Sequence, residues 1–294
     1  MAQHSLPSLI NLCIDLSNET TAFNYLLHVK ALKKPEKCPF CDHPDLSLKR
    51  PPTYYRCKGC RKGFSMLSST FFANSKLPLS EILLFGYLWV TRAPVSLIRS
   101  AIPGLSSATA TCWGKHFTQL VAWDMMHNEQ KIGGPNVVVE IDESKFGKRM
   151  YNRGHRIEGV WVVGGVERTA ERRMFAIRVE DRTAKTLMDI IESYVLPGSI
   201  VITDCWKGYA SDQLQAMGIK HLTVNHSIQF VNPETGAHTN TIEGTWSGMK
   251  TKIHKRHRTS QFMEGELFRI IWERVHKEGL WARLLHAMGT VRYV

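Results

Sequence analysis

The pattern of hydrophobic and polar positions predicts helices in the first half of the chain. One or two short amphipathic helices are expected within residues 1–30. Three further helical stretches follow, each with start or stop signals: Pro78 to Val90, Pro94 to Ile102, and Ser106 to Trp123. The second and third are separated by a glycine-containing turn. This order fits a helix-turn-helix reader of DNA, and it fits a plain three-helix bundle between two domains equally well.

The pattern changes to strands in the second half. Apolar runs bounded by turn signals predict five strands, at residues 137–142, 157–166, 173–180, 199–204 and 221–225. Helices are predicted after the third, fourth and fifth strands, at residues 183–194, at 206–217 and from about residue 240. The order βββαβαβα is that of a ribonuclease H-like fold, in which the first and fourth strands are neighbours. The expected fold class is therefore α/β, with an α+β mixed sheet, and one or two helices are expected between residues 262 and 285.

Three acidic residues occupy corresponding places in this pattern. Asp142 and Asp204 end the first and fourth predicted strands, and Glu243 lies in the helix whose inward stripe includes Trp246. Asn240 or Thr241 can serve as the N-cap of that helix, and its stripe is completed by Ile242 and Met249. Because adjacent strands lie about 5 Å apart, the two aspartates are expected to be neighbours. The alternative is that both aspartates are turn residues and that Glu243 is an ordinary exposed residue.

Converging carboxylates point to a hard divalent cation. Three such groups repel one another unless a cation lies between them, and oxygen-only ligation favours Mg²⁺ or Mn²⁺. Two ions about 4 Å apart stabilise the attacking and the leaving oxygen of an in-line phosphoryl displacement. One ion would activate water or a 3′-hydroxyl, and the other would neutralise charge on the departing oxygen. The pattern thus predicts Asp142, Asp204 and Glu243 as catalytic metal ligands.

Four cysteines form a separate and more specific pattern. Cys38 and Cys41 make one C-x-x-C pair, Cys57 and Cys60 make another, and fifteen residues separate the pairs. This spacing suits four thiolates on one tetrahedral zinc ion in a zinc ribbon, whose folding would depend on the metal. Two incidental pairs, or a redox pair, are the alternative. Four sulfur ligands leave no open position for water, so this zinc would be structural.

The net positive charge of the chain predicts a polyanionic partner. The 294 residues carry 38 Lys and Arg against 26 Asp and Glu, a formal charge of +12. The basic residues crowd beside the candidate acids, which favours a site that handles phosphates over a merely solvated face. The candidate DNA contacts, which include polar neighbours of the acids, are Lys145, Lys148, Arg149, Arg153, Arg156, His226, His238, Asn240, Lys250, Lys252, Lys255, Arg256 and Arg258.

Composition excludes several other classes. A hydrophobic content of 43% is that of an ordinary globular protein rather than a disordered one. No apolar run approaches the roughly 20 residues that a membrane-spanning helix needs, so no membrane partner is expected. The first residues do not resemble a secretory signal, and we therefore expect an intracellular protein.

Six longer motifs carry a family resemblance. They are Glu140-Ile141-Asp142-Glu143-Ser144-Lys145-Phe146, Asn152-Arg153-Gly154, Gly159-Val160-Trp161-Val162, Thr203-Asp204-Cys205-Trp206-Lys207-Gly208-Tyr209, Val224-Asn225-His226-Ser227 and His238-Thr239-Asn240-Thr241-Ile242-Glu243-Gly244-Thr245-Trp246. Residues 137–256 thereby resemble the catalytic domain of Merlin-superfamily DNA transposases and their bacterial insertion-sequence relatives. The preceding zinc ribbon and helical segment also resemble that family's layout. The resemblance implies cut-and-paste transposition with Asp142, Asp204 and Glu243 as the acidic triad.

The resemblance also implies a domain order and partners. The expected segments are an N-terminal helical segment (1–35), a zinc ribbon (36–66), a helical DNA-binding region (67–132), the catalytic domain (133–258) and C-terminal helices (259–294). The expected partners are the terminal inverted repeats, target DNA and further copies of the chain. The Ser144-Lys145-Phe146 motif favours a eukaryotic host and hence the nucleus. A bacterial member would act in the cytoplasm on the nucleoid.

Two other readings remain open on the sequence alone. One is a non-catalytic DNA-binding regulator derived from a transposase, which would use only the zinc ribbon and the helices. The presence of all three acids argues against it. The other is a structure-selective nuclease on the same fold, which would cut DNA without joining strands.

Overall fold

The computed structural model describes residues 6–128, 131–147, 159–204, 209, 211–224 and 238–292. It divides into two compact units, one of Met1–Met126 with His276–Val294 and one of His127–Val275. This division is coarser than the five predicted segments, whose bounds stay predictions. Within the described ranges, every helix is too short or too polar to cross a membrane.

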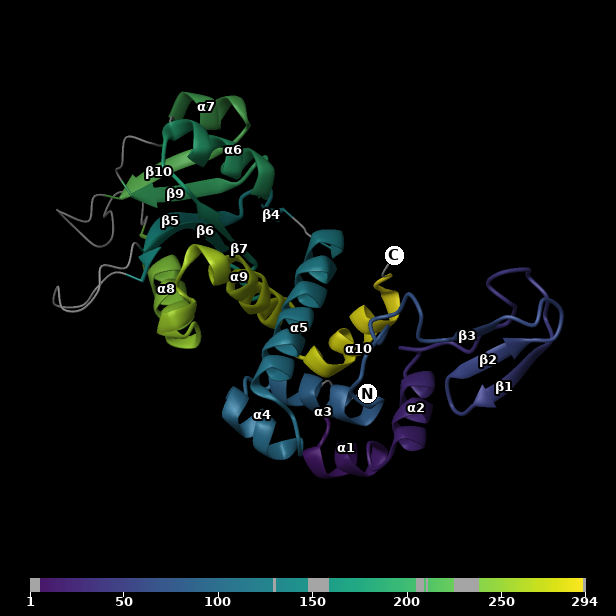
Figure 1. Cartoon of the computed structure of the whole chain (residues 1–294). Helices are drawn as coiled ribbons and strands as arrows, with labels where there is room; N and C mark the ends of the chain where they lie inside the picture. Colours follow the sequence, from purple (N-terminus) through teal and green to yellow (C-terminus); the bar gives the residue numbers. More distant parts are fainter. Residues whose placement is uncertain are drawn as a thin grey trace. The chain divides into compact units, whose positions relative to one another are not determined.

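Helices dominate the first unit, as the sequence pattern predicts. They are α1 (Leu9–Asp15), α2 (Glu19–His28), α3 (Leu79–Val90), α4 (Val95–Ala101), α5 (Ser107–Asn128) and α10 (Leu280–Thr290) (Figure 1). The ring of Phe85 in α3 stacks on that of Phe117 in α5, with 5.7 Å between centroids. Asp124 in α5 is 1% exposed and pairs with Arg283 in α10 at 2.6 Å. These contacts unite helices that are distant in sequence.

The predicted helix–turn–helix order is also present in this unit. The turn between α4 and α5 contains Gly104, whose φ of +77° lies in the left-handed region that glycine adopts without strain. Ser106 then accepts a hydrogen bond from the amide of Thr109 at 3.0 Å and so caps the start of α5. The helical elements are thus confirmed, while DNA reading by them stays a prediction.

A small three-stranded sheet lies between α2 and α3 in the sequence. It consists of β1 (Leu46–Arg50), β2 (Tyr54–Cys57) and β3 (Gly63–Ser65), paired antiparallel in that order. The strands are short, and only Cys57 among their residues is buried. Apolar burial within the sheet is therefore slight, and its one buried residue is a member of the predicted zinc site.

The second unit is built on a mixed five-stranded sheet. Its strands are β5 (Val138–Phe146), β6 (Val160–Glu167), β7 (Met174–Val179), β9 (Ile200–Asp204) and β10 (Lys220–Val224), in the order β10-β9-β5-β6-β7. Strands β5, β6 and β7 form an antiparallel meander, and β9 and β10 run parallel to β5. The predicted meander is confirmed. So is the predicted adjacency of the first and fourth strands, here β5 and β9.

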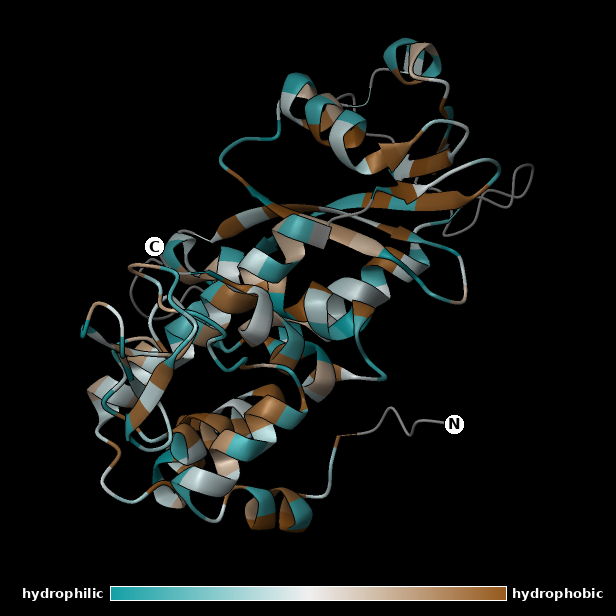
Figure 2. Ribbon diagram, turned by 90° about the vertical axis from the view of Figure 1, so that its right-hand side faces the viewer, coloured by the Kyte–Doolittle hydropathy of each residue, from teal (hydrophilic) through white to brown (hydrophobic). Residues whose placement is uncertain are grey.

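Helices cover both faces of this sheet. In Figure 1, α6 (Ala184–Tyr194) and α7 (Ser211–Ala216) lie on one side, and α8 (Asn240–Lys252) and α9 (Ser260–Val275) lie on the other. The apolar stripe of α6, which includes Leu187 and Ile191, packs on Val139, Ile141 and Val201. Figure 2 shows hydrophobic residues concentrated along the strands, while the helices carry both kinds of residue. The short segments β4 (Ile132–Gly133), β8 (Val195–Leu196) and η1 (Lys255–His257) complete the unit.

Two details differ from the sequence prediction. The strand expected to end at Asp142 continues to Phe146, because its antiparallel pairing with β6 runs on after its parallel pairing with β9 stops. Asp142 therefore lies within a strand rather than at its end. In addition, the N-cap of α8 is Thr239, not Asn240 or Thr241.

Candidate functional site

Strand register brings the two aspartates together. Val138 lies opposite Ile200, and Glu140 lies opposite Ile202, in the parallel pair of β5 and β9. The pairing ends at Glu140. Continued for two more residues, the same register places Asp142 beside Asp204. Because side chains on one face alternate with a period of two, both carboxylates project from the face that α8 covers.

The aromatic ring of Trp246 fixes one side of the site. Trp246, in α8, is 4% exposed, and its indole Nε1–H donates a hydrogen bond to Oδ2 of Asp142 at 2.9 Å. Gly164 lies directly opposite Asp142 in β6, where a Cβ atom would come within 2.5 Å of the Trp246 ring. The ring also meets Phe146 edge-on, with 6.0 Å between centroids. The absence of a side chain at Gly164 thus makes room for the ring that holds Asp142.

Glu243 comes from the first turn of α8. The neighbouring residues Ile242 and Trp246 are buried, whereas Glu243 itself is exposed. Its Oε1 accepts a hydrogen bond from the hydroxyl of Thr239 at 3.1 Å. Thr239 is the N-cap, but its side chain makes no capping bond to the backbone of α8. The hydroxyl that usually satisfies a helix N-terminus is therefore directed to Glu243 instead.

A buried carboxylate from the sheet takes over the capping role. Glu140 is 0% exposed, and its Oε2 accepts the backbone amide of Ile242 at 2.9 Å. Its Oε1 accepts from Nε of Arg168 at 2.5 Å, and Nδ1 of His238 lies 3.5 Å away. A carboxylate at a helix N-terminus satisfies free amides and interacts well with the helix dipole. Glu140 therefore joins the strand of Asp142 to the helix of Glu243.

The electrostatics agree with an acidic cluster. Burial raises the pKa of Asp142 above its ordinary value, and hydrogen bonds from the Trp246 indole and the Glu143 amide oppose that rise. The negative charges of Asp204 and Glu243 raise the pKa of Asp142 further. The carboxylates of Asp204 and Glu243 are thus both close enough to Asp142 to disfavour its ionisation, which is the situation that a bound cation relieves.

A fourth acid stands on the opposite face of β5. Burial, together with the charges of Asp204 and Asp142, raises the pKa of Glu143 to about 7, although the hydroxyl of Tyr209 donates a hydrogen bond to it. Arg182 forms an ion pair with Glu143 at 3.7 Å, which opposes the rise in its pKa, and its guanidinium also stacks over the Trp161 ring. Glu143 therefore carries a proton more readily than an ordinary glutamate does.

The acids do not form a closed coordination shell. Among the described residues, the four cysteines are the one group of three or more ligand side chains whose ligand atoms all lie within 4.8 Å of one another. Oxygen donors fit Mg²⁺ or Mn²⁺ in kind. The roles of Asp142, Asp204 and Glu243 stay predictions.

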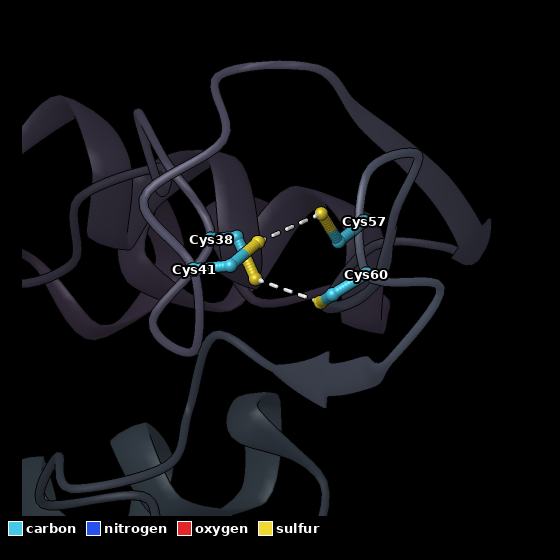
Figure 3. A group of neighbouring side chains, drawn as sticks. All are labelled: Cys38, Cys41, Cys57 and Cys60. Atoms are coloured by element: carbon cyan, nitrogen blue, oxygen red, sulfur yellow. Dashed lines mark hydrogen bonds between the residues drawn. The ribbon is translucent and has the colours of Figure 1, made fainter.

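The cysteine cluster has the geometry of a tetrahedral metal site. Figure 3 shows the four side chains pointing toward one another, two from the turn of Cys38 and Cys41 and two from the end of β2 and the turn after it. Sγ of Cys38 lies 3.7 Å from that of Cys60, and Sγ of Cys41 lies 3.6 Å from that of Cys57. Sulfur atoms about 2.3 Å from a tetrahedral zinc lie about 3.8 Å apart. Burial opposes ionisation of Cys57, yet the Cys60 amide and the neighbouring thiols lower its pKa to about 6. The cluster can therefore hold zinc.

Comparison with known proteins identifies the segment that carries the acids. Residues 132–264 match the family model of the ISXO2-like transposase domain. The chain is also 31% identical over 83 residues to an uncharacterized transposase-like protein of Haemophilus influenzae. That match covers 28% of this chain and 64% of the relative's length.

Both comparisons support a transposase family. The matched segment begins at β4, contains the whole five-stranded sheet and extends into α9, so it includes all three predicted acids. The narrower Merlin assignment is not confirmed and stays a prediction.

The structure describes some of the predicted DNA contacts and not others. Five of them lie outside the described residues, namely Lys148, Arg149, Arg153, Arg156 and His226. Five others are exposed in the second unit, namely Lys145, Asn240, Lys252, Lys255 and Arg256. Nζ of Lys250 lies 5.4 Å from the Phe146 ring centroid, where burial lowers its pKa. The guanidinium of Arg258 donates to the carbonyl oxygens of Lys250 and Ile253 and so also satisfies the end of α8. Contact with DNA stays a prediction for all of them.

Sequence reasoning missed Glu140, Thr239 and Gly164. A signal for Glu140 was present, because a carboxylate two residues before Asp142 must share its face of the strand. No pattern in the sequence connects Glu140 with Ile242, since that contact depends on where α8 docks on the sheet. The need for glycine at position 164 likewise follows only from the Trp246 ring that lies over it.

Proposed function

We propose that this protein is a cut-and-paste DNA transposase with a ribonuclease H-like catalytic domain. It would bind terminal inverted repeats, cleave the transposon ends by metal-dependent hydrolysis and join the resulting 3′-hydroxyl ends to target DNA. The observation that carries the proposal is the register of β5 and β9, which aligns Asp142 with Asp204 inside the segment that matches a transposase domain. The strand order β10-β9-β5-β6-β7 supports the ribonuclease H-like assignment.

The acids would hold divalent cations. Asp142 and Asp204 offer carboxylates on one face of the sheet, and Glu243 offers a third on a long side chain at the exposed start of α8. Mg²⁺ or Mn²⁺ bound there supplies an activated oxygen nucleophile and neutralises charge on the leaving oxygen. The donor set fits such ions in kind, because all its ligand atoms are oxygens.

The chain's own residues would orient these ligands. Trp246 holds Oδ2 of Asp142 through its indole N–H, which leaves the other carboxylate oxygen for the metal. Thr239 donates to Glu243, and Glu140 secures the helix turn from which Glu243 projects. Such partners behind metal ligands commonly affect metal affinity by one or two orders of magnitude.

The remaining parts would bring DNA to the site. The zinc ribbon and the helical region recognise the terminal repeats in this proposal, and the basic residues around α8 contact the phosphates. Two ends must be processed together, so the working form is a dimer or a larger assembly. A member of the Merlin superfamily in a eukaryote would act in the nucleus, and a bacterial member would act in the cytoplasm on the nucleoid.

A cleavage and joining assay tests the proposal. The zinc-loaded full chain is incubated with DNA that carries the element's terminal repeats, with Mg²⁺ or Mn²⁺, and both cleaved and joined products are measured. We expect products from the parent and a loss of about a hundred- to a thousandfold for Asp142→Ala, since removing a key electrostatic group costs that much. Cleavage without joining indicates a structure-selective nuclease, and DNA binding without cleavage indicates a regulator. An Asp142→Ala protein as active as the parent contradicts the mechanism.

A further inference from the structure

The three-stranded sheet of the zinc ribbon presents a row of apolar side chains on one face. Leu48 in β1 lies opposite Tyr55 in β2, and Tyr55 lies opposite Phe64 in β3. Directly opposed residues of antiparallel strands share a face, so these three side chains stand side by side. Phe40, from the first cysteine loop, extends the line by meeting Phe64 edge-on, with 6.3 Å between ring centroids. Three of these four residues are aromatic, and we call the four together the aromatic row.

The aromatic row is open to solvent. Phe40 is 55% exposed and Leu48 is 46% exposed, while Tyr55 and Phe64 are half-buried. The rings of Tyr55 and Phe64 are nearly parallel, with 23° between planes and 6.1 Å between centroids. A module this small has few apolar residues to spare, yet none of these four is buried. Exposed clusters of this kind mark interaction sites.

The charge around the row indicates the chemistry of the partner. Residues 33–62 contain nine Lys and Arg against three Asp and Glu. Nζ of Lys62 lies 5.0 Å from the centroid of the Phe40 ring, so positive charge reaches the row itself. Such a surface attracts a phosphate backbone and disfavours a purely apolar protein surface, whose binding would bury these cations.

Flat aromatic rings on a basic sheet suit unpaired bases. Bases stack on exposed aromatic side chains while neighbouring cations follow the phosphates, and every base can take part because each has a π face. In an intact duplex the base faces are stacked on one another and cannot reach the rings. We propose that the aromatic row is a stacking platform for single-stranded DNA. This inference goes beyond the proposed function, because it does not depend on Asp142 or on cleavage.

Equilibrium binding to the full, zinc-loaded chain tests the platform. The probes are a fluorescent oligothymidylate of about 12 nucleotides and a duplex of the same length, measured by anisotropy over a range of salt. We expect Tyr55→Leu and Phe40→Leu each to weaken single-strand binding by about fivefold or more and to leave duplex binding nearly unchanged. The slope of log affinity against log salt should stay the same in these variants, since no charge is lost. Lys62→Ala should reduce that slope by about 0.7.

A matched control separates stacking from support of the fold. Tyr54 neighbours Tyr55 in β2 but points to the other face, where it packs under Arg50 and over Gly63. Tyr54→Leu should therefore keep parental single-strand affinity, and all variants should keep their zinc. The proposal is overturned if Tyr55→Leu and Phe40→Leu bind the single strand as the parent does. It is also overturned if Tyr54→Leu shows an equal loss, or if the parent binds only the duplex.

Discussion

Glu140 and Ile242 are 102 positions apart in the sequence, yet the carboxylate of one accepts the backbone amide of the other at 2.9 Å. Glu140 stands two residues before Asp142, and Ile242 stands one residue before Glu243. The hydrogen bond therefore connects the strand and the helix that carry two of the three candidate metal ligands, within two residues of each. A displacement of either β5 or α8 would therefore move both Asp142 and Glu243.

Replacing Glu140 by glutamine should loosen this connection. Glutamine can still accept the Ile242 amide, but the guanidinium of Arg168 loses its charged partner. We expect a local loss of about 1.5 to 3 kcal/mol, as for other hydrogen bonds to charged groups. Hydrogen exchange of the β5 and α8 amides measures it. Affinity for Mn²⁺, followed by electron paramagnetic resonance, should fall by about tenfold.

Glu167→Gln is the matched control for this change. Glu167 is also 0% exposed, and it pairs with Arg173 and with the amide of Gly133, away from α8. It should cost comparable stability but leave Mn²⁺ affinity at the parental value. Equal Mn²⁺ affinity in Glu140→Gln and the parent would remove the positioning role of Glu140. A parent that binds no Mn²⁺ would instead count against the proposed catalytic site.

Thr239 should act on Glu243 through one hydroxyl group. Thr239→Val keeps the shape of this buried side chain but removes the donor that reaches Glu243 Oε1 at 3.1 Å. We expect Mn²⁺ affinity to fall several-fold in Thr239→Val and to be restored in Thr239→Ser, which retains the hydroxyl. Thr245→Val is the control, since within the described part of the chain the Thr245 hydroxyl donates to the Thr241 carbonyl of the same helix and not to an acid. Failure of serine to restore binding would contradict the role.

The sequence predicted most elements of the second unit because its strands are apolar runs separated by strong turn signals. The placement of Asp204 at the end of β9 and the adjacency of β5 and β9 followed from that order. The end of β5 did not, because the polar residues Glu143, Ser144 and Lys145 interrupt the apolar run. Their pairing with β6 is a tertiary effect that local propensity does not contain.

The sequence predicted the three acids of the site but not the residues that hold them in place. Asp142, Asp204 and Glu243 stand out because charged residues beside buried strands need a reason. The link from Glu140 to Ile242 and the cover of Gly164 by Trp246 depend on the docking of α8. The helix cap was missed for the same reason, since rules of local sequence look for the cap within the helix's own segment.

Gly164 should tolerate no side chain. A Cβ atom there would lie 2.5 Å from the Trp246 ring and 3.1 Å from the carbonyl oxygen of Phe175, so the ring must move away from Asp142. We expect Gly164→Ala to destabilise the second unit by about 1 to 3 kcal/mol. Gly248→Ala, at an open and exposed position of α8, should instead stabilise it by about 0.5 to 1 kcal/mol. Thermal unfolding of both variants measures the contrast, which a stable Gly164→Ala protein would refute.

Removal of zinc should unfold the ribbon without unfolding the second unit. The strands β1 to β3 bury little apolar surface, so their order depends on the four sulfur atoms. A strong chelator, or Cys57→Ser, should make residues 36–66 sensitive to limited proteolysis and lower the bound zinc from one ion per chain. Cys112→Ser, at an exposed cysteine outside the cluster, should change neither. A zinc-free ribbon that resists proteolysis would show that the cysteines pack without metal.

Glu143 should make stability depend on pH between about 4.5 and 7. Its pKa in the folded chain is about 7, above its ordinary value of 4.5, so the folded state binds the extra proton in that window. Stability is then lost as the pH rises through this range, by up to about 3 kcal/mol from this group. Glu143→Gln removes the charge but can still accept the hydroxyl of Tyr209. Without added Mg²⁺, the variant should therefore be more stable than the parent at pH 8, and the two should converge near pH 4, below the ordinary pKa of 4.5. Unfolding curves at both pH values measure the difference, and a constant gap between the two proteins would show that Glu143 stays ionised throughout.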